Sequence, residues 1–315
     1  MFVAARRITA CCSVLAPGLD APWVMSCFRI GVGAARLLLC IAGLLASVPA
    51  IHAQSGISGA EDPNSVLTNT VLTVPLQDYS IAGLVTHVPD AKAFKYGIAL
   101  FPGYPSIMKL REEGGQPRFE LGGNFLIRSR RHWLDRETLV ISIDAPSDQW
   151  GSFSQQFRQN ARYGGDVAAL LAEAGRRYGV KDWTLVGTSE GSVSAFHVAR
   201  MNPALAPRLI LSASLFLSSG NGPGLSGTDW EGLAPRLLWV HHEEDPCALT
   251  PYREALRYAQ MTRSPLLAVR GGGPSRGAPC EARSAHGFVG VERATVLAMR
   301  SWVKTGVTPA DVVGE

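Results

Sequence analysis

The sequence has few cysteines, little net charge and no long apolar run. Six Cys in 315 residues are too few for a disulfide scaffold, and they include no C-x-x-C pair or Cys/His cluster of the kind that binds zinc. The basic residues are scattered, and a formal net charge of +4 is too small and too diffuse to indicate a nucleic-acid partner. Internal repeats and low-complexity linkers are also absent, and no sequence boundary suggests a second domain.

Apolar residues are plentiful. They make up 46% of the chain, which is ample for a packed core and argues against disorder. A chain of 315 residues can form one large domain or two small ones.

The longest early apolar run, residues 37–49, reads LLLCIAGLLASVP and follows Arg29 and Arg36. Small-residue cleavage patterns end at Ala50 and at Ala53, which completes the layout of a secretory signal peptide. The alternative is a membrane anchor, but the run is shorter than the ~20 residues that cross a bilayer. We therefore predict a signal peptide over residues 1–53, with the true start at Met1 or at Met25, and no stable membrane anchor after cleavage.

Removal of residues 1–53 changes the composition. That segment holds four of the 30 basic residues and one of the 26 acidic ones, so the remainder is close to neutral. It also holds four of the six Cys, leaving Cys247 and Cys280. We expect a loose leader over 54–69, one folded domain over 70–305 and a tail over 306–315.

Short apolar runs recur along this domain, and most are rich in β-branched or aromatic residues, as is typical of buried parallel strands. They span 96–101, 138–143, 183–188, 209–217, 237–241 and 266–269. Helical patterns lie between them over 125–134, 167–178, 193–201 and 291–303. This alternation predicts an α/β fold with a mainly parallel, doubly wound sheet, and the runs 71–75 and 81–88 predict an antiparallel hairpin ahead of it.

One short motif stands where chemistry is expected. Residues 187–191 read GTSEG and match G-x-S-x-G, with Ser189 between a predicted strand and a predicted helix. That context is the strand–turn–helix of a nucleophile elbow. A second match, residues 273–277, leads into no helix and is interpreted as a flexible loop.

A nucleophilic serine needs a base and a carboxylate that orients the base. In the elbow geometry they follow in the order Ser, acid, His. Asp245 comes just after the predicted strand 237–241, where ligand-facing residues of open α/β sheets lie, and His286 is the only His after position 242. We predict a Ser189–Asp245–His286 triad, with Glu243 and Glu244 as rival acids.

Acyl transfer also needs N–H donors for the oxyanion. One is the amide that follows the nucleophile, here that of Glu190, and the other comes from the loop after the third strand. That loop reads FPGYP over 101–105, and its two prolines have no N–H. We expect Tyr104 to donate and Gly103 to permit close approach; the alternative is an ordinary Pro-Gly turn.

Cys247 lies two residues after the predicted acid, and Cys280 lies six before the predicted base. In an exported protein a disulfide between them would persist and would tie the two catalytic loops together. Two free thiols are the alternative.

These motifs resemble the α/β-hydrolase superfamily over nearly all of residues 70–305: the 101–104 turn, the GTSEG elbow, the HHEEDPC acid turn and SAHGF around His286. The chain is most similar to small exported bacterial hydrolases of undefined substrate, and the disulfide is similar to that of some cutinase-like enzymes. The oxyanion turn departs from the family, since it begins Phe-Pro-Gly where many members have His-Gly. The resemblance implies ester hydrolysis through an acyl-enzyme without metal or organic cofactor.

The segment between the strands near 217 and 237 is too short for a cap domain, so we expect an open cleft. Trp150, Phe153, Trp230 and His242 are candidates for its walls, with simple packing as the alternative for the aromatic residues. The predicted partner is a small or polymeric ester, in the periplasm or outside the cell. A serine peptidase or amidase with the same triad, and a non-catalytic binding protein on the same scaffold, are the competing functions.

Overall fold

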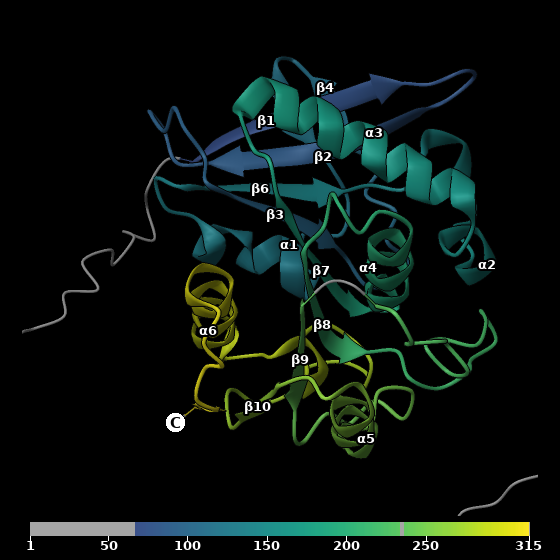
Figure 1. Cartoon of the computed structure of the whole chain (residues 1–315), viewed down its shortest axis with the longest axis vertical. Coiled ribbons are helices and arrows are strands. Elements are labelled where there is room, and N and C mark those ends of the chain that lie inside the picture. Colours follow the sequence, from purple (N-terminus) through teal and green to yellow (C-terminus); the bar gives the residue numbers. More distant parts are fainter. Residues whose placement is uncertain (1–66, 234–235, 315) are drawn as a thin grey trace, which may run out of the picture. The chain divides into compact units, whose positions relative to one another are not determined.

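The computed structural model describes residues 67–233 and 236–314 (Figure 1). The predicted signal peptide and most of the predicted leader lie outside these residues. No helix in the described part of the chain is long and apolar enough to cross a bilayer.

A nine-stranded sheet forms the centre, in the order β1-β2-β6-β3-β7-β8-β9-β10-β11. Its strands are β1 (Thr68–Pro75), β2 (Ser80–His87), β3 (Tyr96–Phe101), β6 (Thr138–Ile143), β7 (Trp183–Ser189), β8 (Arg208–Ser214), β9 (Arg236–His242), β10 (Leu266–Arg270) and β11 (Val312–Val313). Strand β2 pairs antiparallel with β1 and with β6, and every other neighbouring pair is parallel. The predicted hairpin and parallel sheet are therefore confirmed.

Helices cover both faces of this sheet (Figure 1). The helical elements are α1 (Phe125–Ser129), η1 (Arg130–Trp133), η2 (Ser147–Gln149), α2 (Gln155–Arg158), α3 (Ala161–Tyr178), α4 (Glu190–Met201), α5 (Tyr252–Thr262), η3 (Ala285–Gly287) and α6 (Glu292–Thr305). Apolar residues of α3, α4 and α5 belong to one core cluster, and those of α1, η1 and α6 belong to another. The sheet is thus doubly wound, with a core on each side.

Alternation along the strands supplies both cores. In β9, Leu237 and Trp239 face the α3–α5 core, whereas Leu238 and Val240 face the α1–α6 core. Successive side chains of a strand point to opposite faces, so strands covered on both sides read as continuous apolar runs. This is why the sequence pattern located these strands.

Several boundaries differ from the expected ones. Strand β8 ends at Ser214 rather than at residue 217, because the amides of Phe216 and Leu217 donate to the carbonyl of Leu249 and draw the chain away from the sheet. The single helix expected over 125–134 is α1 followed by a 3₁₀ turn. The helices α2 and α5, the strand β11 and a small hairpin of β4 (Arg111–Glu113) and β5 (Gln116–Arg118) were not predicted, nor were the 3₁₀ turns η2 and η3.

Candidate active site

The GTSEG segment forms the junction of β7 and α4. Ser189 has φ 51° and ψ −125°, a backbone conformation that residues other than glycine rarely adopt. The Ser192 hydroxyl donates to the Ser189 carbonyl (2.6 Å) and accepts from the amide of Leu215 (3.1 Å), which holds the sharp turn in place. The GTSEG segment therefore has the strand–turn–helix geometry that a nucleophile elbow requires.

The second glycine of the motif permits a close crossing of two backbones. A Cβ at position 191 would lie 2.1 Å from the carbonyl oxygen of Phe101 and 2.5 Å from that of Pro102. These atoms belong to β3 and to the turn after it, so neither can rotate away as a side chain could. Helix α4 consequently starts directly against the turn that contains Tyr104.

A Gly191→Ala substitution should therefore lower both stability and activity. Overpacking of this kind costs about 1–3 kcal/mol, and a displacement of about 1 Å at a catalytic site can lower the rate 10²-fold. Thermal unfolding and kcat measure the two effects. Gly165→Ala is the matched control, because its helical site in α3 has no atom within 4 Å of an added Cβ. The control should be neutral or slightly stabilising, and equal behaviour of the two variants would contradict the crossing.

His286 lies in the 3₁₀ turn η3, whose N-cap, Ser284, accepts from the His286 amide (3.1 Å). Its ring Nδ1 is 3.0 Å from Oδ2 of Asp245. An ionised carboxylate can only accept, so the proton is on Nδ1 and the lone pair of Nε2 is free to take a proton from a nucleophile. The structure thus brings the predicted base and acid into contact.

The Asp245 carboxylate is fully buried and surrounded by donors. The amide of Cys247 donates to Oδ1 (2.9 Å), and the hydroxyl of Thr250 donates to Oδ2 (2.8 Å). Nε2 of His241 lies 3.3 Å from Oδ2 and 2.7 Å from the Thr250 carbonyl. Burial alone would raise the pKa of Asp245, but hydrogen bonds from His241 and His286 outweigh it and hold the pKa below its ordinary value. The Asp245 carboxylate therefore stays ionised beside His286.

The rival acids take other partners. Glu243 pairs with Arg270 (2.6 Å) and accepts from the hydroxyl of Tyr252. Glu244 is exposed, and its amide donates to His242. Among Glu243, Glu244 and Asp245, only Asp245 contacts His286 in the described structure.

Ser189 and His286 line one cavity of about 190 Å³ at the carboxyl edge of the sheet. Its other described residues come from the 103–104 turn, the start of α1, the end of β7 and the loop before η3: Gly103, Tyr104, Asn124, Phe125, Thr188, Cys280, Glu281, Ala282 and Gly287. The Ser189–His286 hydrogen bond is not formed in the described structure. The cavity is nevertheless the place where a group bound to Ser189 would meet His286.

Both predicted oxyanion donors border this site. Glu190 is the first residue of α4, and first-turn amides have no acceptor within the helix. Tyr104 lines the cavity with its side chain 68% exposed. A Cβ at position 103 would lie 3.1 Å from Cβ of Ser189, which shows how closely this turn approaches the predicted nucleophile.

Hydrogen bonds fix the turn that contains Tyr104. The hydroxyl of Ser106 donates to the Pro102 carbonyl (2.6 Å), and the carboxylate of Asp144 accepts from the amides of Met108 (2.6 Å) and Leu110 (2.7 Å). Asp144 directly follows β6 and is itself buried. No sequence signal distinguishes such an anchoring carboxylate from a solvent-exposed one.

The four residues considered as cleft walls do not line the Ser189 cavity. Trp150 donates to the carbonyl of Ala145, and Phe153 is buried against Arg158. Nε2 of His242 donates to the Gly271 carbonyl (2.8 Å), and its Nδ1 accepts from the Glu244 amide. Trp230 packs on Phe196, Trp239 and Tyr258.

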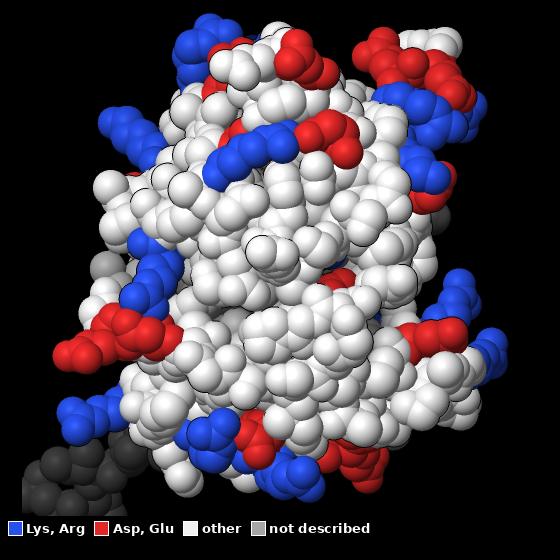
Figure 2. All heavy atoms as spheres, turned by 90° about the vertical axis from the view of Figure 1, so that its right-hand side faces the viewer, with Lys and Arg blue, Asp and Glu red and all other residues white. Residues whose placement is uncertain are grey.

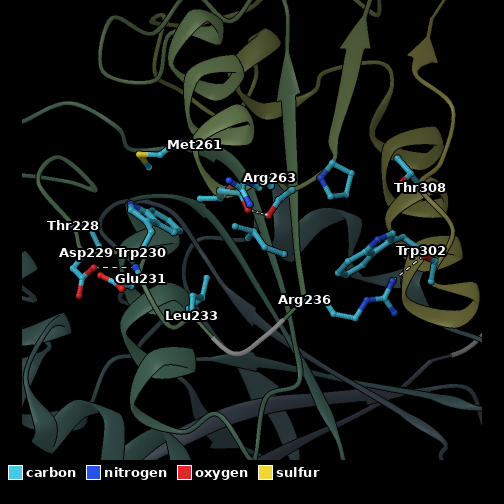
Figure 3. Close-up of a pocket in the computed structure, with 15 residues that line it drawn as sticks. Thr228, Asp229, Trp230, Glu231, Leu233, Arg236, Met261, Arg263, Trp302 and Thr308 are labelled. Carbon is cyan, nitrogen blue, oxygen red and sulfur yellow. Dashed lines mark hydrogen bonds between the residues drawn. The ribbon is translucent and has the colours of Figure 1, made fainter. Parts of the chain in front are cut away.

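Trp230 also lines a separate cavity of about 810 Å³ (Figure 3). This cavity includes Arg236 and Leu237 at the start of β9 and Pro265 just before β10, so it lies at the amino ends of these strands. The Arg236 guanidinium stacks over Trp302 there and donates to the Gly306 carbonyl. At ~3.3 Å per residue, a strand of this length separates it by roughly 20 Å from the edge that holds the predicted triad.

Cys247 and Cys280 form a disulfide, with their Cα atoms 4.6 Å apart. It joins the Asp245 turn to the loop that precedes His286. Cys280 itself lines the Ser189 cavity.

The carboxyl edge of the sheet presents few charges at its centre. Figure 2 shows this side, with Lys, Arg, Asp and Glu mostly around the margin and uncharged residues between them. Within residues 67–233 and 236–314, no group of three or more His, Cys, Asp and Glu side chains is arranged to hold a metal ion.

No protein-family model and no curated protein matches the sequence. The structure is similar to an esterase from Pyrobaculum calidifontis, with a TM-score of 0.53 and 17% identity over 76% of this chain and 86% of that one. It is also similar to Est1E from Butyrivibrio proteoclasticus, with a TM-score of 0.51 and 11% identity over 74% and 97%. A third similar structure is an α/β serine hydrolase without lid from Xanthomonas campestris, with a TM-score of 0.50 and 14% identity over 76% and 93%. Together with the strand order, these similarities establish the α/β-hydrolase fold.

Proposed function

We propose that the protein is an exported serine hydrolase that cleaves carboxylic esters through an acyl-enzyme. The observation that carries this proposal is the strained Ser189 elbow in one cavity with His286, whose Nδ1 is bonded to the buried Asp245. A fold alone does not determine a function, but this site has each group that acyl transfer requires.

The residues take the following roles. The hydroxyl of Ser189 attacks the ester carbonyl while Nε2 of His286 takes its proton, and Asp245 holds the imidazole in the required tautomer. The amides of Glu190 and Tyr104 stabilise the oxyanion. His286 then protonates the departing alcohol, and water hydrolyses the acyl-enzyme by the same route in reverse.

Three observations favour esters over peptides. The centre of the cleft edge has few charged groups (Figure 2), so it offers no cluster of acidic groups for a peptide amine. Between β8 and β9 the chain has only 21 residues, so no recognition domain is inserted there. One of the three similar structures, that from Pyrobaculum calidifontis, is described as an esterase.

The experiment is a substrate panel of p-nitrophenyl esters, feruloyl esters, polyesters and aminoacyl amides. We expect turnover of esters and at least 10-fold lower kcat/KM for amides. Ser189→Ala should lower kcat on the preferred ester by up to ~10⁶-fold, as loss of a triad serine does. Hydrolysis of amides alone would replace the esterase with an amidase, and equal activity of wild type and Ser189→Ala would exclude the proposed nucleophile.

The proposed export rests on the sequence of residues 1–53 together with the Cys247–Cys280 disulfide. Disulfides persist in oxidising compartments. Mass spectrometry of the protein from a bacterial expression host should show an amino terminus at residue 51 or 54. A chain that keeps residues 1–53 would contradict signal cleavage.

A further inference from the structure

Helix α2 is a single turn that places two polar side chains in the core. Gln155 and Arg158 are both fully buried, although such residues are mostly exposed in proteins. They are three positions apart, so both project from one side of the turn. Neither residue belongs to the predicted triad, and no sequence motif includes them.

The Arg158 guanidinium contacts three separate segments. It donates to the hydroxyl of Ser194 in α4 (3.0 Å), to the carbonyl of Pro105 (3.1 Å) and to that of Phe153 (3.2 Å). The ring of Phe153 lies under the guanidinium, 3.8 Å from its central carbon. A planar donor fork stacked on an aromatic ring is held in one orientation.

The same guanidinium pairs with the carboxylate of Glu190, which directly follows the nucleophile. The distance from the Arg158 nitrogen to Oε2 is 3.5 Å, and Glu190 is 3% exposed. The amide of Gln155 donates to the other oxygen, Oε1 (3.1 Å), and the Gln155 carbonyl oxygen accepts from Gly224 (2.8 Å). The carboxylate therefore points into the core, while the amide of the same residue stands at the start of α4.

Arg158 thus joins the two parts of the predicted oxyanion hole. One bond ends on Pro105, next to Tyr104, and the ion pair ends on Glu190. Pro105 follows Tyr104, the first expected donor, and Glu190 carries the amide that is the second. These two chain segments are about 85 residues apart in the sequence.

We propose that Arg158 is a positioning residue that sets the spacing between the Tyr104 turn and the amide of Glu190, and so sets the geometry of the oxyanion hole. This rests on the proposed hydrolase function. Arg158 must reach both the Pro105 carbonyl and the Glu190 carboxylate. Lysine could not replace it, because the lysine ammonium is a single point charge and not a planar fork of donors.

The test compares a charge-balanced double variant with a control. Arg158→Met alone would leave the Glu190 carboxylate buried and unpaired, which is strongly destabilising. Arg158→Met combined with Glu190→Gln removes both charges and keeps an acceptor for Gln155. Arg130→Met is the matched control, since Arg130 is a half-buried arginine that donates to the Ile127 carbonyl and lies outside the site.

For a p-nitrophenyl ester, measured well below the lowest unfolding temperature, the double variant should lose about 100-fold in kcat with KM changed less than about 3-fold. An alkylboronic acid forms a tetrahedral adduct with a nucleophilic serine and places an oxygen in the oxyanion hole. Its affinity for the double variant should therefore fall by a factor similar to the loss of kcat, and not stay nearly constant as KM does. Arg130→Met should alter the unfolding temperature and leave kcat within about 2-fold.

A double variant that keeps wild-type kcat and boronate affinity, or that loses no more kcat than Arg130→Met, would overturn the role of Arg158. A wild-type protein that hydrolyses no ester and binds no boronate would instead overturn the proposed function. The two failures are therefore distinguishable in the same experiment.

Discussion

Asp245→Asn should lower kcat for a p-nitrophenyl ester by about 10⁴-fold. An amide at this position can donate to the His286 Nδ1 and stabilise the wrong tautomer, which is the effect of this change in a serine-protease triad. Such a loss corresponds to roughly 5–6 kcal/mol of transition-state stabilisation. The neighbouring bonds from Cys247 and Thr250 to the side chain should keep its position nearly unchanged.

The neighbouring acids provide the controls. Glu243→Gln and Glu244→Gln should remain within about 5-fold of wild type, because Glu243 is paired with Arg270 and Glu244 is exposed. A large loss in either control with an active Asp245→Asn would identify a different catalytic acid.

The same substitution should change the response of stability to acid. The pKa of Asp245 is below its ordinary value, so its ionised form stabilises the fold fully above about pH 4. That stabilisation is lost as pH falls through the lowered pKa. Thermal unfolding between pH 5 and pH 2 should therefore decline less steeply in Asp245→Asn than in wild type, and identical slopes would contradict the lowered pKa.

Removal of the disulfide is the second large effect that we expect. A bridge between Cys247 and Cys280 closes a loop with a sequence separation of 33, for which chain entropy gives roughly 3–4 kcal/mol. In a domain of this size each kcal/mol shifts the unfolding temperature by about 2–4 °C, so Cys247→Ser with Cys280→Ser should lower it by roughly 6–15 °C. The activity of this variant should also fall near its unfolding temperature, because the bridge joins the loops of Asp245 and His286.

Treatment with reductant distinguishes the effect of losing the bridge from the effect of replacing the two side chains. Dithiothreitol should lower the unfolding temperature of the wild type toward that of the double serine variant, and it should leave the variant unchanged. An unfolding temperature that neither treatment alters would mean that the bridge contributes nothing to stability.

The sequence predicted the sheet well for a physical reason. Strands such as β3 and β6 are buried on both faces, so their residues are mostly apolar and the runs end where the strands end. Helix α5 was missed although its buried Ala255, Tyr258 and Ala259 follow a helical period, because charged and polar residues make up much of the rest of this short helix. Strand β11 has only two residues, too few for a pattern.

Some residues of the candidate site were predictable from the sequence, and others were not. The order Ser189, Asp245, His286 and their places after strands are properties of the chain, and from them the contact between Asp245 and His286 was predictable. Arg158, Thr250 and His241 act only through partners that the fold supplies. From sequence alone, an arginine such as Arg158 is expected on the surface, because its carboxylate partner, Glu190, lies on another element.

The most direct test of the central claim is labelling with a fluorophosphonate probe, followed by mass spectrometry of the modified peptide. The proposed acyl-enzyme mechanism predicts one adduct, on Ser189, at a rate that falls strongly in His286→Ala. It predicts no adduct in Ser189→Ala. A folded wild-type protein that remains unlabelled, or that carries the adduct on another serine, would contradict the proposed nucleophile.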